Sequence, residues 1–136
     1  MDEDEWLLRH GLRPDERGLD EVRALLREHI GLERQSQGDG DTILMKLCCV
    51  QLFQAARLDD VLLIWSAKMA SWEAGFSIDI QLLCGAGLER TKAYLAEQSS
   101  PESEAALKRL RYCEDAGDFD GFSPAERFAY YAAYYE

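Results

Sequence analysis

The chain has 136 residues, of which 47% are hydrophobic and 30% are charged, so we expect a single globular domain spanning residues 1–136. Its formal net charge of −11 disfavours nucleic acids and anionic membranes as partners, because both repel an acidic protein. The first residues are acidic rather than basic, and the four cysteines form no CxxC pair. We therefore expect a cytoplasmic protein with reduced, buried thiols.

Helical signals follow one another through the first half of the chain. Apolar side chains recur at helical spacing in a short segment around residues 6–8 and again over residues 19–35. Asp41 can cap a third helix that runs to about Ala56, and Asp59 can cap a fourth helix that runs through Gly75. On the fourth helix, Trp65 and Trp72 are seven residues apart, and we expect both to face the core.

The segment after Gly75 is ambiguous. Residues 76–82 alternate between apolar and polar side chains, as a strand does, but a helical apolar face also runs from Ile80 to Leu95. The sequence holds no clear partner strand, and a lone strand cannot satisfy its backbone hydrogen bonds. We therefore favour a helix from Ser77 to about Gln98, with a strand as the alternative.

The last third of the chain carries the clearest helix starts. Pro101 follows Ser99 and Ser100, and Ser123–Glu126 reads as a capping box with proline at the first helical position. The sequence therefore predicts an all-α fold of six to seven short helices. We expect them to pack as antiparallel hairpins in an irregular bundle, and a solenoid-like stack is a further possibility.

A glycine pair could suggest nucleotide chemistry. Gly85 and Gly87 follow an apolar run, but Arg90 stands where a dinucleotide-binding loop has its third glycine. We interpret these small residues as a place where a neighbouring helix packs closely. An enzyme that uses this turn to bind a nucleotide is the alternative.

No metal or catalytic motif survives inspection. The segment Asp118–Gly121 resembles part of a calcium loop, but Ala116 and Arg127 occupy the first and twelfth positions, where carboxylates belong. His10 and His29 belong to no cluster with metal-ligand spacing. The sequence thus predicts no catalytic residue, no cofactor and no metal, and we expect that the protein is not an enzyme.

The negative charge is concentrated in two flanks. Residues 1–41 carry 12 acidic and 6 basic side chains, and residues 99–136 carry 8 and 4, whereas the apolar middle is nearly neutral. Such flanks suit a cationic protein partner. Tyrosine is enriched at interfaces, so a tyrosine-rich helix beside an acidic loop is a candidate epitope. The predicted partner-binding residues are Glu114, Asp115, Asp118, Asp120, Tyr130 and Tyr134.

Residues 62–65 (LLIW) and 77–88 (SIDIQLLCGAGL) carry a resemblance that extends over about residues 47–95 and the loop at 117–122. This part of the chain resembles small acidic helical immunity proteins that bacteria encode beside polymorphic or secreted toxins. The resemblance implies a protein that binds a basic toxin domain, such as a nuclease or a nucleotide-acting enzyme, and occludes its active site. The alternative is a helical adaptor or regulator that binds a peptide or helix in a groove, for which an exposed Trp65 or Trp72 would be the distinguishing feature.

Overall fold

The computed structural model describes residues 1–136 and is all-helical, as the sequence predicts. The expected number of helices was too low, because the chain forms eight α-helices and two short 3-10 helices. In chain order they are α1 (Glu3–His10), α2 (Glu16–Gln35), α3 (Thr42–Ala55), η1 (Leu58–Asp60), α4 (Val61–Lys68), α5 (Trp72–Ser77), η2 (Ile80–Cys84), α6 (Leu88–Gln98), α7 (Pro101–Asp115) and α8 (Pro124–Tyr135). Packing as antiparallel hairpins stays a prediction.

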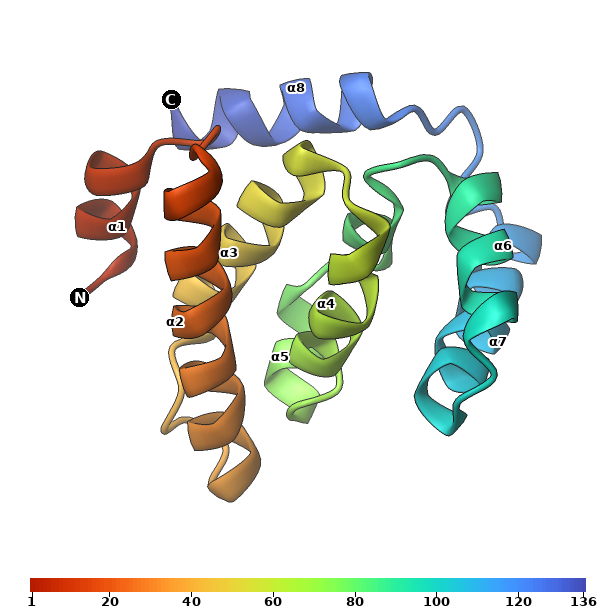
Figure 1. The fold of residues 1–136 in the computed structure, drawn as a ribbon, viewed down its shortest axis with the longest axis horizontal. Coiled ribbons are helices and arrows are strands. Elements are labelled where there is room, and N and C mark those ends of the chain that lie inside the picture. Colours follow the sequence, from red (N-terminus) through yellow and green to blue (C-terminus); the bar gives the residue numbers. More distant parts are fainter.

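Helix α3 is the centre of the molecule. It contacts α1, α2, α5 and α8. In Figure 1, α1 and α2 lie to the left of it, α6 and α7 lie at the right-hand side of the molecule, and α8 crosses the top. Apolar side chains surround almost its whole circumference, which is typical of a helix buried in a core. Ile43 is the exception: it is largely exposed, although its neighbours Leu44 and Met45 in the same turn are fully buried.

The one polar side chain deep in α3 is hydrogen-bonded through both its oxygen and its nitrogen. Gln51 accepts a hydrogen bond from Trp6 Nε1 (3.0 Å) and donates one through Nε2 to the Gly11 carbonyl (2.7 Å). A buried amide without such partners would be costly, so these two bonds fix α1 and the turn after it against α3. The buried apolar side chains form one cluster that extends from Trp6 to Tyr131.

Several helix starts lie where the sequence places them. The Asp41 carboxylate accepts hydrogen bonds from the Ile43 and Leu44 amides, and Ser100 and Ser123 cap α7 and α8, each followed by proline. The Ser123 hydroxyl accepts from the Glu126 amide, but the reciprocal bond of a capping box occurs at α7, between Ser100 and Ser103. These caps depend on residues close in sequence, which is why they could be predicted.

The helix expected from an Asp59 cap to Gly75 is wrong. Asp59 lies within η1, α4 ends at Lys68, and a new helix, α5, begins at Trp72. The Ser71 hydroxyl accepts from the Ala74 amide and donates to the buried Glu33 carboxylate of α2 (2.5 Å). This contact between distant parts of the chain fixes the start of α5, so the continuous apolar stripe is broken.

The continuous helix expected from Ser77 to Gln98 is also wrong, and the alternative strand does not form either. Ser77 ends α5, residues 80–84 form the 3-10 helix η2, and α6 begins only at Leu88. Gly87 has a φ of +99°, in the left-handed region that a regular helix does not visit. A Cβ on Gly85 would lie 2.1 Å from the Phe53 carbonyl oxygen, so the interpretation of Gly85 as a close-packing position is confirmed.

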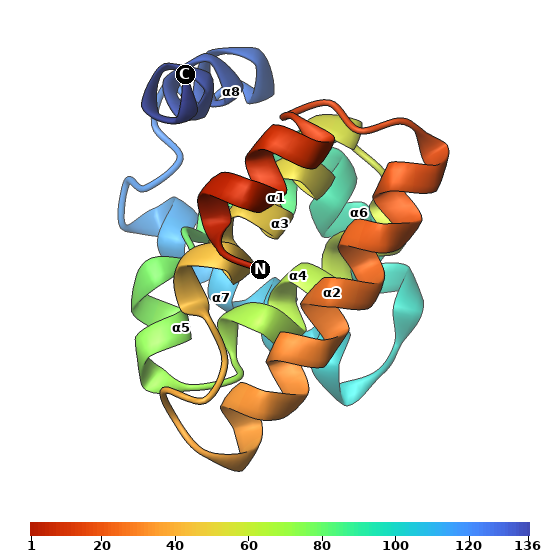
Figure 2. The same ribbon diagram turned by 90° about the vertical axis from the view of Figure 1, so that its left-hand side faces the viewer.

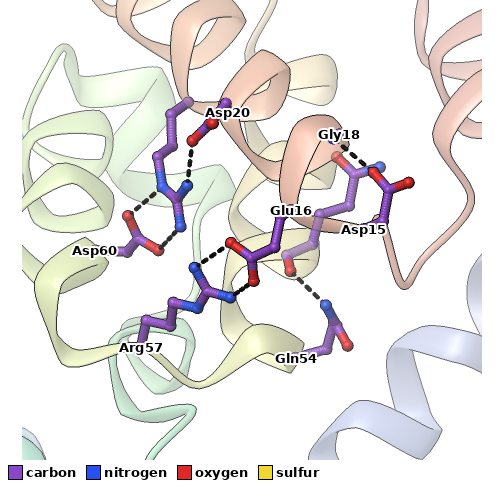
Figure 3. A network of polar contacts seen from close by, with 9 residues as sticks. Asp15, Glu16, Gly18, Asp20, Gln54, Arg57 and Asp60 are labelled. Atoms are coloured by element: carbon purple, nitrogen blue, oxygen red, sulfur yellow. Dashed lines mark hydrogen bonds and ion pairs between the residues drawn. The ribbon is translucent and has the colours of Figure 1, made fainter.

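An ion-pair network joins α2 to the connection between α3 and α4 (Figure 3). The Arg23 guanidinium contacts both oxygens of the buried Asp60 carboxylate, at 2.7 and 2.9 Å, and also reaches Asp20 at 2.9 Å. Nearby, Arg57 pairs with Glu16 across the same gap. Fork-like pairing of this kind fixes geometry as well as charge, so the network is structural. None of the helices combines the length and the apolar character that a membrane crossing requires.

Candidate functional site

Helix α8 is attached to the body through a polar cluster around Asp79. The Tyr131 hydroxyl donates to Asp79 Oδ2 (2.6 Å), and Arg127 Nη2 and Lys46 Nζ lie 3.4 and 3.8 Å from the same oxygen. Burial and the hydrogen bond to Asp79 raise the pKa of Tyr131 well above its usual value, so the hydroxyl remains a donor. Tyr130 and Tyr134, on the same helix, are both largely exposed.

The acidic loop between α7 and α8 and the start of α8 enclose a small hollow of about 240 Å³. Asp118, Asp120, Glu126 and Tyr130 line it together with Arg127. The three carboxylates make no ion pair within the chain. Arg127 is already engaged by Asp79 and by the faces of the Tyr130 and Tyr131 rings, at 5.3 and 5.4 Å. We call this hollow the acidic hollow.

The structure brings together only part of the predicted set. Asp118, Asp120 and Tyr130 line the acidic hollow, whereas Glu114 and Asp115 do not. Glu114 is paired with Lys92 Nζ at 2.8 Å, so its charge is largely compensated within the chain. Asp115 is exposed at the end of α7, and Tyr134 is exposed one turn beyond Tyr130 on α8.

A second surface, which the sequence interpretation missed, lies between α5 and α7. Trp72 and Phe76 are 79% and 82% exposed, and their rings stack with centroids 5.8 Å apart. They border a hollow of about 560 Å³ whose other side is formed by Arg109 of α7. The prediction that Trp72 faces the core is therefore wrong, whereas the same prediction for Trp65 is confirmed. The start of α5 at Ser71 turns Trp72 out of the stripe that buries Trp65.

The hollow continues along α7. A neighbouring hollow of about 520 Å³ is also bordered by Met69 and Arg109, and it extends to Lys108 and to Tyr112, which is 73% exposed. We call the combined surface the α5–α7 groove. Its residues are Lys68, Met69, Trp72, Phe76, Lys108, Arg109 and Tyr112. The signal that could have indicated it is Ser71, a favourable N-cap residue followed by Trp72 and an acid in the first turn.

Lys68 supports the floor of this groove. Its ammonium group donates to the Gly75 carbonyl at 2.6 Å and to the Ile78 carbonyl at 2.5 Å, at the C-terminal end of α5. Burial and then the neighbouring charge of Arg109 lower the pKa of Lys68. A six-residue helix has few hydrogen bonds of its own, so this lysine helps to hold Trp72 and Phe76 in place.

Neither surface carries an arrangement of side chains for metal chemistry, since the chain holds no group of three or more His, Cys, Asp or Glu side chains placed to bind an ion. The four cysteines are free and buried, and burial raises the pKa of Cys48 and Cys84 to about 12. Such thiols are poor nucleophiles at neutral pH. Comparisons with protein-family models, with curated proteins and with solved structures found no match.

Proposed function

We propose that this chain is a non-catalytic bacterial immunity protein that binds a toxin domain and neutralises it by occluding the active site. The observation that supports this proposal most directly is the acidic hollow. There, the unpaired carboxylates of Asp118, Asp120 and Glu126 lie beside the exposed ring of Tyr130. A toxin that acts on nucleic acids or nucleotides needs a basic cleft, which such a surface complements.

The proposed mechanism is occupation of the toxin's substrate site. The carboxylates of the acidic hollow pair with substrate-binding lysines and arginines, while Tyr130 and Tyr134 fill the cleft. The net charge of −11 accelerates encounter with a basic partner more than it sets the final affinity. The proposal also assigns a cytoplasmic location, and its support is the presence of four free, buried cysteines, which is typical of a reducing compartment.

The test is co-expression with the product of the neighbouring gene. We expect the two proteins to co-purify and the chain to rescue growth. Asp118→Lys combined with Asp120→Lys should abolish both effects, because like charges then oppose the basic cleft. Glu28→Lys combined with Glu97→Lys is the matched control, since it changes the net charge equally at exposed acids far from the hollow. Absence of binding and of rescue by the unchanged chain would eliminate the proposal.

A second candidate function is an adaptor or regulator that binds a peptide or helix. The exposed Trp72 favours it, because Trp, Tyr and Arg are the residues that most often dominate binding energy, and the α5–α7 groove holds one or more of each. In this case, Trp72→Ala should abolish partner binding and the Asp118→Lys, Asp120→Lys variant should retain it. The reverse pattern supports the immunity proposal.

A further inference from the structure

The α5–α7 groove differs in chemistry from the rest of the chain. Four exposed apolar or aromatic side chains border its two hollows: Met69, Trp72, Phe76 and Tyr112. They come from three segments, the end of α4, helix α5 and helix α7, so folding gathers them into one surface. Clusters of exposed apolar residues rimmed by polar ones are characteristic of interaction sites.

The charge of the groove is opposite to the charge of the molecule. Lys108 and Arg109 are exposed on its α7 side and make no ion pair, although the chain carries 26 acidic residues. The buried Lys68 adds a third positive charge next to the stacked rings. An occupant that brings carboxylates would therefore find unpaired cations here, whereas a basic occupant would be repelled.

We propose that the α5–α7 groove binds an acidic, apolar segment of a partner protein. Apolar side chains of the segment pack on Trp72 and Phe76, and its carboxylates pair with Arg109 and Lys108. This inference deepens the second candidate function, on which it rests, by naming the chemistry of the partner. It does not depend on the immunity proposal, because the groove shares no residue with the acidic hollow.

A protein segment fits the groove better than an anionic membrane does. The surface is concave, with two adjoining hollows of about 560 and 520 Å³, and such hollows receive individual side chains. A flat anionic bilayer would instead bring the net charge of −11 close to its own charge. Aromatic and cationic side chains in a hollow are also the usual anchors of protein interfaces.

The test is a selection of random peptides displayed on phage against the immobilised full chain. We expect the enriched peptides to combine Leu, Phe, Met or Trp with Asp and Glu. Selection on Arg109→Glu should lose the preference for acids, whereas selection on Arg111→Glu should keep it. Arg111 is the matched control because it is exposed on the same helix, borders neither hollow and gives the same change in charge.

A synthetic copy of an enriched peptide then gives a direct measurement. Trp6 and Trp65 are buried, so Trp72 is the one largely exposed tryptophan, and its emission should shift to shorter wavelength when the peptide covers it. We expect Arg109→Glu to weaken binding about tenfold or more, which corresponds to the loss of one desolvated charge contact. Trp72→Ala should abolish binding while circular dichroism shows an unchanged helix content.

Three outcomes would overturn the inference: no enrichment on the unchanged chain, a preference for basic peptides, or equal effects of the Arg109 and Arg111 substitutions. Anionic vesicles of phosphatidylglycerol form a separate arm, and a Trp72 shift with vesicles but not with peptide would assign the groove to lipid. If the groove binds no peptide, the toxin-rescue experiment can still succeed. Loss of rescue in Asp118→Lys, Asp120→Lys leaves peptide binding untouched, so the two proposals are tested independently.

Discussion

Glu33 stabilises a loop and a helix start with a single buried carboxylate. One oxygen accepts from the Gly38 and Gly40 amides, at 2.9 and 3.1 Å, and the other accepts from the Ser71 hydroxyl. Burial by itself raises the pKa of Glu33, but these hydrogen bonds outweigh it and the pKa is lowered. The ionised form is therefore the one that the folded state stabilises.

The sign of the pH dependence follows from this lowered pKa. The contribution of Glu33 is present above the ordinary value of 4.5 and is lost as pH falls through the lower pKa of the folded state. Glu33→Gln should cost about 1–3 kcal/mol at neutral pH, since hydrogen bonds to a charged group are lost, and should flatten the acid limb of the stability curve. Urea unfolding at several pH values measures both effects. If the free energy of unfolding falls equally steeply at acid pH in the variant and in the unchanged protein, Glu33 is not the group responsible.

Replacing either of two glycines by alanine should change the stability of the fold, but in opposite directions. A Cβ on Gly85 would lie 2.1 Å from the Phe53 carbonyl oxygen, a severe clash, whereas a Cβ on Gly31 of α2 would meet nothing within 4 Å. Gly85→Ala should therefore destabilise by about 1–3 kcal/mol or more, because the backbone must shift. Gly31→Ala should stabilise by about 0.5–1 kcal/mol through helix propensity. Thermal unfolding of the two variants checks both signs, and equal shifts would show that Gly85 does not pack closely.

At the scale of an element, α8 depends on few contacts with the body. Figure 1 shows it lengthwise along the top of the molecule, and Figure 2, in which it is seen nearly end-on, shows it at the edge of the other helices. Tyr131 is its single buried residue. Tyr131→Phe removes the hydrogen bond to Asp79, so it should cost about 1 kcal/mol and increase amide exchange over residues 124–135. Tyr130→Phe is the control, since that hydroxyl is exposed and should be neutral. Unchanged exchange in Tyr131→Phe would mean that apolar packing alone holds α8.

The elements also show which structural features the sequence could reveal. The caps at Asp41, Ser100 and Ser123 are local, and each was predicted from neighbouring residues. The start of α5 at Ser71 also has a local cap, the hydrogen bond from the Ala74 amide, but the apolar stripe that continues to Trp72 favoured an unbroken helix. The second bond of Ser71, to Glu33 38 positions earlier, is a pairing that the sequence does not show. Gly85 is intermediate: its small size indicated close packing, but the sequence does not show that its partner is Phe53 of α3.

The candidate sites likewise combine features that neighbouring residues indicate with features that depend on contacts between distant parts of the chain. Asp118, Asp120 and Tyr130 are near one another in sequence, and the expectation that they form one surface agrees with the hollow that they line. Glu114 is withdrawn from that surface by Lys92 of α6, a contact between helices that charge counting cannot reveal. The α5–α7 groove was missed because it is formed by residues about 40 positions apart, and because Trp72 belongs to the core only if α4 continues past Lys68.

At the scale of the whole molecule, the excess of acids opposes folding. Self-repulsion of a net charge of −11 is long-ranged, whereas the pairing of the buried Asp60 with Arg23 is short-ranged and shielded from solvent. Raising the salt concentration from about 20 mM to about 200 mM shortens the screening length from roughly 20 Å to roughly 7 Å. Salt should therefore weaken the repulsion much more than it weakens the pairing.

We accordingly expect the free energy of unfolding at neutral pH to rise with sodium chloride over this range, by about 1 kcal/mol or less, as is usual for surface charges. Urea unfolding at each salt concentration measures the change. The Glu28→Lys, Glu97→Lys variant, which carries four fewer net negative charges, is the control and should show a smaller rise. A fall in stability with salt would mean that exposed ion pairs such as Arg57 with Glu16 outweigh the repulsion between the acidic flanks.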